Sequence, residues 1–182
     1  MKKLLWIDLE TTGLDVNYCL ILEVGMIVTD TNLNILDSFS AVIHRTQYDM
    51  NHMNDWCRKT HAESGLLTEV RLSGLSQGEV EQQAMQFITK HFGDEKPVAF
   101  GSSVHFDKKF IEKHMPSLNR KFHYRIVDVS SFKETLKILF NYEVPMSSAK
   151  HRALDDIKGS INEYSKYLDL INVHRPSKEF HL

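Results

Sequence analysis

The chain has few of the residues that mark secreted, fibrous or membrane-spanning proteins. Its 182 residues include two cysteines, four prolines and eight glycines. Cys19 and Cys57 show neither a CxxC nor a zinc-type spacing, so we expect buried, reduced thiols in a cytosol-like compartment. No apolar run approaches the roughly 18 residues of a membrane span. The run that follows the first lysines stops at Asp8, too early for a signal peptide. We therefore expect a cytoplasmic protein with no membrane partner.

An excess of positive charge is also lacking. The chain has 22 Lys and Arg against 24 Asp and Glu, which gives a formal net charge of −2. Proteins that hold long nucleic acids through many phosphates usually carry a basic excess. The balance does not exclude a nucleic-acid substrate, but it indicates a short one or contacts concentrated in a small site.

The order of the apolar segments predicts a mixed α/β domain. Strand-like segments over 4–9, 20–30 and 35–44 are separated by turns and should form an antiparallel meander. Further strands are expected over 97–103 and 123–131, and helices over 53–65, 76–92, 105–115, 130–140 and 151–168. A helix connects the last two strands, which favours a parallel pair. We expect one domain over residues 1–182, a mixed five-stranded sheet flanked by helices.

Two of these helices carry more specific signals. Ser76 stands where an N-cap residue is needed for the helix over 76–92. The helix over 130–140 is expected to turn three apolar side chains toward the core: Phe132, Leu136 and either Leu139 or Phe140.

Two carboxylates occupy alternate positions where the first strand ends. Asp8 and Glu10 should point to the same face of the sheet, because side chains i and i+2 of a strand share a face. Buried together they repel and need a cation, yet no Lys or Arg occurs between Lys3 and Arg45. A divalent metal such as Mg²⁺ or Mn²⁺ is one solution, and exposure of both acids in a turn is the other.

Other acids stand in comparable places, and each alone is a weak signal. Asp107 follows a predicted strand and could serve only the dipole of the helix that begins there. Asp155 and Asp156 lie near the start of the last helix, just after His151. Helical periodicity does not decide which of the two acids faces a common site.

Taken together, these residues resemble a known pattern. A D-x-E on the first strand, an Asp after a central strand and an H-x4-D on the closing helix are similar to the DEDDh family of 3′→5′ exonucleases. The family positions fall on Asp8, Glu10, Asp107, His151 and Asp156. The resemblance implies a ribonuclease H-like fold, and its spacing selects Asp156 over Asp155.

Within that family the chain most resembles the oligoribonucleases. The segments that carry this resemblance are WIDLETTGLD, HYRIVDVSS and SSAKHRALDDIKGSI. It implies a 3′→5′ exoribonuclease that degrades very short RNA, dinucleotides in particular, to nucleoside 5′-monophosphates. Two departures bear on substrate preference: Thr11 stands where oligoribonucleases often have Met, and Ser102 where Asn is usual.

The resemblance also implies roles for individual residues. Asp8, Glu10, Asp107 and Asp156 would hold two divalent ions, Mg²⁺ or Mn²⁺, and His151 would act as general base. Leu14 would wedge between two bases, with Trp56 and Tyr124 packed on base faces. The remaining substrate residues would cap the 5′ phosphate: Ser103, Arg125, Ser130 and Ser131.

The same resemblance implies a homodimer in which the segment 124–131 of the second subunit completes each site. The residues by themselves favour a different interpretation of Leu14 and Trp56, which is plain core packing. His61 is taken as structural, and Glu23, an acid inside an apolar strand, has no explanation from the sequence.

Two rival functions remain. A DEDDh exonuclease acting on DNA ends or tRNA 3′ ends should show basic stripes beside its site, whereas KHFGDEK and DKKFIEKH mix charges of both signs. A catalytically dead binding module on the same fold should lack at least one of the five site residues, and all five are present.

Overall fold

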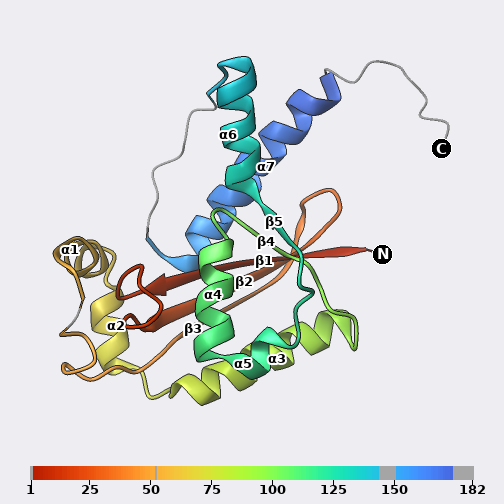
Figure 1. Cartoon of the computed structure of the whole chain (residues 1–182). Coiled ribbons are helices and arrows are strands. Elements are labelled where there is room, and N and C mark those ends of the chain that lie inside the picture. The colour runs from red at the N-terminus through yellow and green to blue at the C-terminus, as the bar shows by residue number, and fades with distance from the viewer. Residues whose placement is uncertain (1, 52, 144–150, 174–182) are drawn as a thin grey trace.

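The computed structural model describes residues 2–51, 53–143 and 151–173, with side chains described to residue 170. Figure 1 shows a sheet with helices on both faces. The strands are β1 (Lys3–Thr11), β2 (Ile21–Asp30), β3 (Ile35–Val42), β4 (Ala99–Gly101) and β5 (Ile126–Asp128). The helices are α1 (Asp55–Glu63), α2 (Leu66–Leu72), α3 (Gln77–Phe92), α4 (His105–His114), α5 (Pro116–Asn119), α6 (Val129–Phe140) and α7 (Ala153–Val173).

The five strands form one mixed sheet in the order β3-β2-β1-β4-β5. The pairs β1–β2 and β2–β3 are antiparallel, whereas β1–β4 and β4–β5 are parallel. The predicted α/β class, the meander and the parallel pair are therefore confirmed. Among the described residues, no helix combines the length and apolar character that a membrane crossing requires.

Alternation along β1 divides the core between the two faces of the sheet. Leu5 and Ile7 are buried against α3, α4 and α5; in Figure 1, α3 and α5 lie below the sheet and α4 crosses in front of it. Trp6 points the other way and packs with Ile157 and Ile161 of α7. Because side chains alternate, the carboxylates that follow Trp6 at every second position also face α7. The helices α1 and α2 form a smaller apolar cluster at the start of β2, around Leu22.

Local residues explain where the helices begin and end. Ser76 caps α3 as predicted, and its partner Glu79 completes a capping box. The helices α2 and α5 were not predicted. Gly65, at φ +79°, ends the turn after α1 and allows α2 to start, while Pro116 occupies the first turn of α5. The predicted last strand is shortened to β5, because α6 already begins at Val129.

The inward face of α6 is shorter than predicted. Phe132 and Leu136 pack against the α7 side of the core. The prediction of a third inward residue is wrong, because Leu139 is 68% and Phe140 69% exposed. Figure 1 shows the reason: α6 extends away from the sheet, so its C-terminal end has no core to face.

Helix α7 approaches the sheet most closely at Gly25 of β2. A Cβ atom at Gly25 would lie 2.6 Å from Cβ and 3.0 Å from the carbonyl carbon of Ala153. Gly25 is the cross-strand neighbour of Asp8. The missing side chain therefore lets the first turn of α7 sit directly above the acidic end of β1.

We expect Gly25→Ala to push α7 outward and to lower the free energy of unfolding by about 1–3 kcal/mol, the usual range for overpacking. Chemical denaturation measures this change. Gly78→Ala is the matched control, because nothing lies within 4 Å of a Cβ there and Gly78 is in helix α3. Equal stability of the Gly25→Ala variant and the parent protein would contradict the close packing.

Candidate active site

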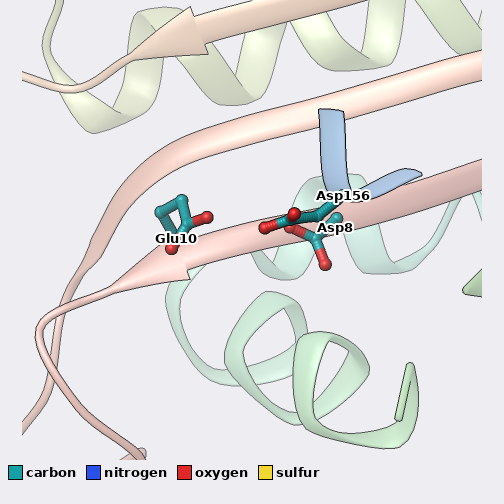
Figure 2. Close-up of side chains that lie close together, drawn as sticks. All are labelled: Asp8, Glu10 and Asp156. Atoms are coloured by element: carbon teal, nitrogen blue, oxygen red, sulfur yellow. The ribbon is translucent and has the colours of Figure 1, made fainter. Parts of the chain in front are cut away.

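Three carboxylates meet where β1 ends and α7 begins. Asp8, Glu10 and Asp156 each offer an oxygen atom, and these atoms all lie within 4.8 Å of one another. Figure 2 shows Asp8 and Glu10 on the strand and Asp156 reaching toward them from the helix. Glu10 is only 8% exposed, and Asp8 and Asp156 are half-buried. The alternative of exposed turn carboxylates is therefore wrong.

The geometry shows which of the two adjacent acids of α7 lies in this cluster. Asp156 lies within the cluster. Asp155 points elsewhere, with an oxygen 3.3 Å from Nζ of Lys158 on the same helix. Neighbouring helical residues differ by about 100° in direction, so only one of the pair can face β1.

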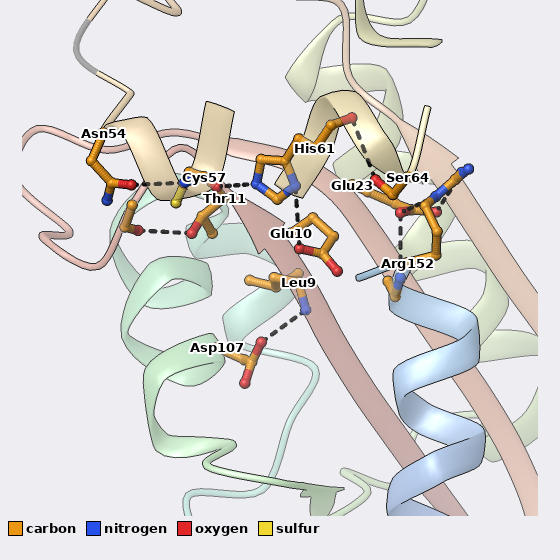
Figure 3. Close-up of polar contacts among 12 residues, drawn as sticks. Leu9, Glu10, Thr11, Glu23, Asn54, Cys57, His61, Ser64, Asp107 and Arg152 are labelled. Carbon is orange, nitrogen blue, oxygen red and sulfur yellow. Dashed lines mark hydrogen bonds and ion pairs between the residues drawn. The ribbon is translucent and has the colours of Figure 1, made fainter. Parts of the chain in front are cut away.

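Asp107, the fourth acid, approaches from the opposite side of β1. It lies in the first turn of α4, is buried, and accepts a hydrogen bond of 2.8 Å from the backbone N–H of Leu9 (Figure 3). With Asp8 it lines a cavity of about 160 Å³. Its oxygen atoms are outside the group of three, so Asp107 flanks the cluster rather than completing it. A first-turn acid that served only the helix dipole would have no need of burial.

Burial, with repulsion from neighbouring acids, raises the pKa of each of three acids. Burial raises the pKa of Asp8 well above its usual range, and Asp107, Glu10 and Asp156 raise it further. Burial, followed by the charges of Asp156 and Glu23, raises the pKa of Glu10 to about 8. Burial raises the pKa of Asp107 to about 7, against the opposing effect of the Leu9 hydrogen bond. Near neutral pH these groups need either protons or a cation.

The donors fit a divalent cation. All are carboxylate oxygens, which Mg²⁺ and Mn²⁺ prefer, and the three closest come from two rigid elements. Arg152 lowers the pKa of Glu10, but its guanidinium is bound to other carboxylates. A metal ion at the cluster would offset the repulsion that remains.

His151 stands at the entrance to α7. Its backbone has φ +53°, in the left-handed region. Its imidazole lies edge-on to the indole of Trp56, with 5.4 Å between ring centroids and 89° between ring planes. Trp56 belongs to α1, so the ring contact joins the start of α7 to the helix that borders the acidic end of β1.

Leu14 and Trp56 do not belong to the core. They are 75% and 63% exposed, so the interpretation of both as core residues is wrong. Both line a cavity of about 640 Å³ whose wall also includes Glu10 and His61. Trp6, in contrast, is fully buried as expected. An apolar cavity that opens beside carboxylates suits a ligand with both bases and phosphates.

The residues expected to cap a phosphate lie in two groups. The hydroxyl oxygens of Ser103 and Ser130 are 3.2 Å apart in this one chain, and the backbone N–H of Ser103 donates to Asp128 and Ser130. Ser130 therefore does not need a second subunit to reach Ser103. Tyr124 and Arg125 line neither of the two cavities, and the guanidinium of Arg125 lies over the exposed ring of Tyr124. The exposed Ser131 follows Ser130 at the start of α6.

His61 is a neighbour of the acids that the sequence did not reveal. It is almost fully buried, and its Nε2–H donates to the carbonyl of Thr11 at 2.8 Å (Figure 3). Its Nδ1 has no hydrogen-bond partner among the residues that the structure describes, and it lies 3.8 Å from Oε2 of Glu10. Burial lowers the pKa of His61, which favours the neutral ring. A single histidine on a short helix gave no signal of this contact.

Glu23 and Arg152 form a second pair that sequence reasoning missed. Glu23 is 2% exposed on β2, opposite Glu10 in the antiparallel register. Nε of Arg152 donates to its carboxylate at 3.1 Å (Figure 3). An acid within an apolar strand was the available signal, but its partner lies 129 residues away.

Comparison with known proteins shows the family of the chain. The family model described as Exonuclease (RNase_T) matches residues 5–164. A probable oligoribonuclease of Dictyostelium discoideum is 40% identical over 168 residues, which cover 91% of this chain and 88% of the relative. The chain belongs to the oligoribonuclease family. An oligoribonuclease of Haemophilus influenzae is 42% identical over 170 residues, which cover 91% of this chain and 93% of that one.

This oligoribonuclease-family chain is also similar in fold to a solved structure. The zinc-bound form of an E. coli ExoI–ssDNA complex superposes with a TM-score of 0.69 at 14% identity. The match covers 96% of this chain but only 43% of that one, so the chain spans less than half of its length. The ribonuclease H-like exonuclease fold is thereby confirmed.

We expect the metal-free protein to lose stability as pH rises from about 6 to about 8. Glu10 has an ordinary pKa of 4.5 and a pKa of about 8 when folded, so in this window the folded chain holds a proton that the unfolded chain has released. Raising the pH removes that proton and restores the repulsion. Thermal unfolding in a chelator measures the fall, and Mn²⁺ should reverse it.

Glu10→Gln should flatten this fall. Asp37→Asn is the control, because hydrogen bonds from Lys90 and His91 lower the pKa of Asp37 to about 2, outside the window. An equally steep fall in the Glu10→Gln variant would show that Glu10 is not its source.

Proposed function

We propose that this protein is a 3′→5′ exoribonuclease that hydrolyses very short RNA, dinucleotides in particular, to nucleoside 5′-monophosphates. The observation that carries the proposal is the convergence of Asp8, Glu10 and Asp156, flanked by Asp107, in a chain of the oligoribonuclease family. One domain over residues 1–182 would hold the whole site. A cytoplasmic location agrees with the two free, buried cysteines.

Two divalent ions, Mg²⁺ or Mn²⁺, would bind to this acidic site. Asp8, Glu10 and Asp156 would hold the first, and Asp8 with Asp107 the second. A pair of such ions activates water as a nucleophile and stabilises charge on the leaving oxygen. One solved structure of the same fold is a zinc-bound form, which agrees with a metal-dependent reaction. The chain's own contribution is to gather the oxygens on β1, α4 and α7, elements fixed by the core.

His151 would act as the general base. The water oxygen bonds to the last phosphorus while an imidazole nitrogen of His151 takes a water proton. The bond from phosphorus to the 3′ oxygen of the preceding nucleotide then breaks, and that oxygen is protonated from solvent. Histidine suits this step because it exchanges protons near neutral pH. Its ring contacts Trp56, which lines the larger cavity.

The exposed apolar residues would hold the bases. Leu14 would separate two bases, and Trp56 would pack against one, since stacking is worth about 1–3 kcal/mol per base and tolerates any sequence. Ser103, Ser130 and Ser131 would bind the 5′ phosphate. A substrate held in this way needs few cations, which agrees with the net charge of −2.

We further propose a homodimer whose partner adds Tyr124 and Arg125 to each site. Two observations support it. The C-terminal part of α6 exposes consecutive apolar residues, including Leu139 and Phe140, and a patch of this kind suits contact with a second protein surface. Tyr124 and Arg125 are prominent on the surface but line neither cavity of their own chain.

A ladder of 5′-phosphorylated RNAs, from a dinucleotide to a decamer, tests the proposed activity. With Mn²⁺, the dinucleotide should be consumed about tenfold faster than the decamer, a difference of about 1.4 kcal/mol. A DNA dinucleotide in parallel tests the sugar preference. Equal rates at every length would contradict the short-substrate claim, and activity in excess chelator would contradict the metal.

Variants test the assigned roles. His151→Ala should lower kcat by about two to four orders of magnitude, the usual contribution of a general base. Asp156→Asn should abolish turnover, whereas Asp155→Asn, its neighbour on α7, should keep the parent rate. Full activity of His151→Ala at neutral pH would remove the base assignment and leave the metal assignment in place.

Substitution on α6 tests the dimer. Leu139→Glu should halve the mass measured by sedimentation and remove dinucleotide hydrolysis, because a charge cannot be buried cheaply at an apolar contact. Leu72→Glu is the control, since Leu72 is also a highly exposed leucine but lies on α2. A monomeric parent protein, or a Leu139→Glu dimer, would contradict the proposal.

A further inference from the structure

An arginine next to the candidate base is held by two carboxylates from different elements. Nε and Nη2 of Arg152 lie 3.1 and 3.2 Å from the two carboxylate oxygens of Glu23 on β2 (Figure 3). Nη1 and Nη2 lie 2.7 and 2.8 Å from those of Glu69 on α2. These hydrogen bonds raise the pKa of Arg152, which is therefore charged at every working pH.

Glu23 binds more than the guanidinium. Its Oε2 accepts a hydrogen bond of 3.3 Å from the backbone N–H of Ala153, and its Oε1 accepts one of 2.8 Å from Ser40 of β3. Two consecutive residues, Arg152 and Ala153, are thus tied to one buried carboxylate on the sheet. The start of α7 is fixed at this point by side chains as well as by packing.

His151 needs such an anchor. Its φ of +53° is a conformation that residues other than glycine adopt only when their surroundings enforce it. The described contact of its own ring is with the exposed indole of Trp56, which is a weak restraint. The next residue along the chain, Arg152, makes the strong contacts.

We propose that Arg152 is a positioning residue for His151. Its planar guanidinium, gripped by Glu23 and Glu69, fixes the turn over residues 151–153 so that the imidazole lies at the acidic site. This inference rests on the proposed function, in which His151 is the general base. Among the described residues, the hydrogen bonds of its guanidinium go to Glu23 and Glu69 and not to the acid cluster.

Charge offers a competing explanation, because Arg152 also lowers the pKa of Glu10. Lysine separates the two. It keeps the positive charge but cannot bind two carboxylates through a planar fork. A role in positioning requires that Arg152→Lys be impaired nearly as much as Arg152→Ala, whereas a role through charge requires that Arg152→Lys be active.

The experiment measures kcat and KM for an RNA dinucleotide with saturating Mn²⁺. Arg152→Lys and Arg152→Ala should each lower kcat by about 10- to 100-fold, the usual effect of losing a residue that orients a catalytic group, with KM unchanged. Lys158→Ala removes a cation from the same helix without touching Glu23 and should keep the parent rate. Mn²⁺ should raise the melting temperature of each variant as it does that of the parent, because the four acids remain.

A double-mutant cycle decides whether Arg152 acts through His151. In the His151→Ala background, Arg152→Lys should cost nothing further in kcat. The inference would be overturned if the fall in kcat of the double variant equalled the product of the two single falls. Full activity of Arg152→Lys would also overturn it. If Arg152→Ala does not fold, the cycle is measured with Arg152→Lys alone. Impaired His151→Ala with normal Arg152 variants rejects the positioning role only, whereas normal His151→Ala rejects the proposed base and this inference with it.

Discussion

Repulsion among buried carboxylates is the constraint on which the rest of this structure depends. Asp8, Glu10 and Asp107 all have raised pKa values because burial separates them from water and each faces other acids. A fold keeps such groups together only if its scaffold resists their separation. Here the scaffold is strand β1 at the centre of the sheet, with α4 packed against one face and α7 against the other. The close approach of α7 to Gly25 helps to hold Asp156 near Asp8 and Glu10 despite this repulsion.

The sequence predicted much of this arrangement because its signals are local. Alternation in β1 placed Asp8 and Glu10 on one face, and Ser76 marked the start of α3. The antiparallel meander followed from the turns, and the parallel pair β4–β5 followed from the helix that connects its strands. The family pattern named Asp156, and the geometry later separated it from Asp155.

The failures share a different physical cause. Whether Leu14 and Trp56 pack inward depends on which element covers them, and a short apolar segment does not state this. Leu139 and Phe140 followed the correct helical period, but α6 extends past the sheet they would have covered. Glu23 contacts Arg152, and His61 lies beside Glu10. Each of these contacts joins residues that are far apart in the chain. Local periodicity in the sequence does not predict such long-range pairs.

The wide separation of the acids along the polypeptide has a consequence for synthesis of the protein. Asp8 leaves the ribosome early, whereas Asp156 lies on the final helix of the described structure. A nascent chain that has completed only the sheet holds two carboxylates of the cluster and not the third. The acidic cluster is therefore complete only when α7 packs against the sheet, so a nascent chain that has not yet added α7 lacks the assembled site.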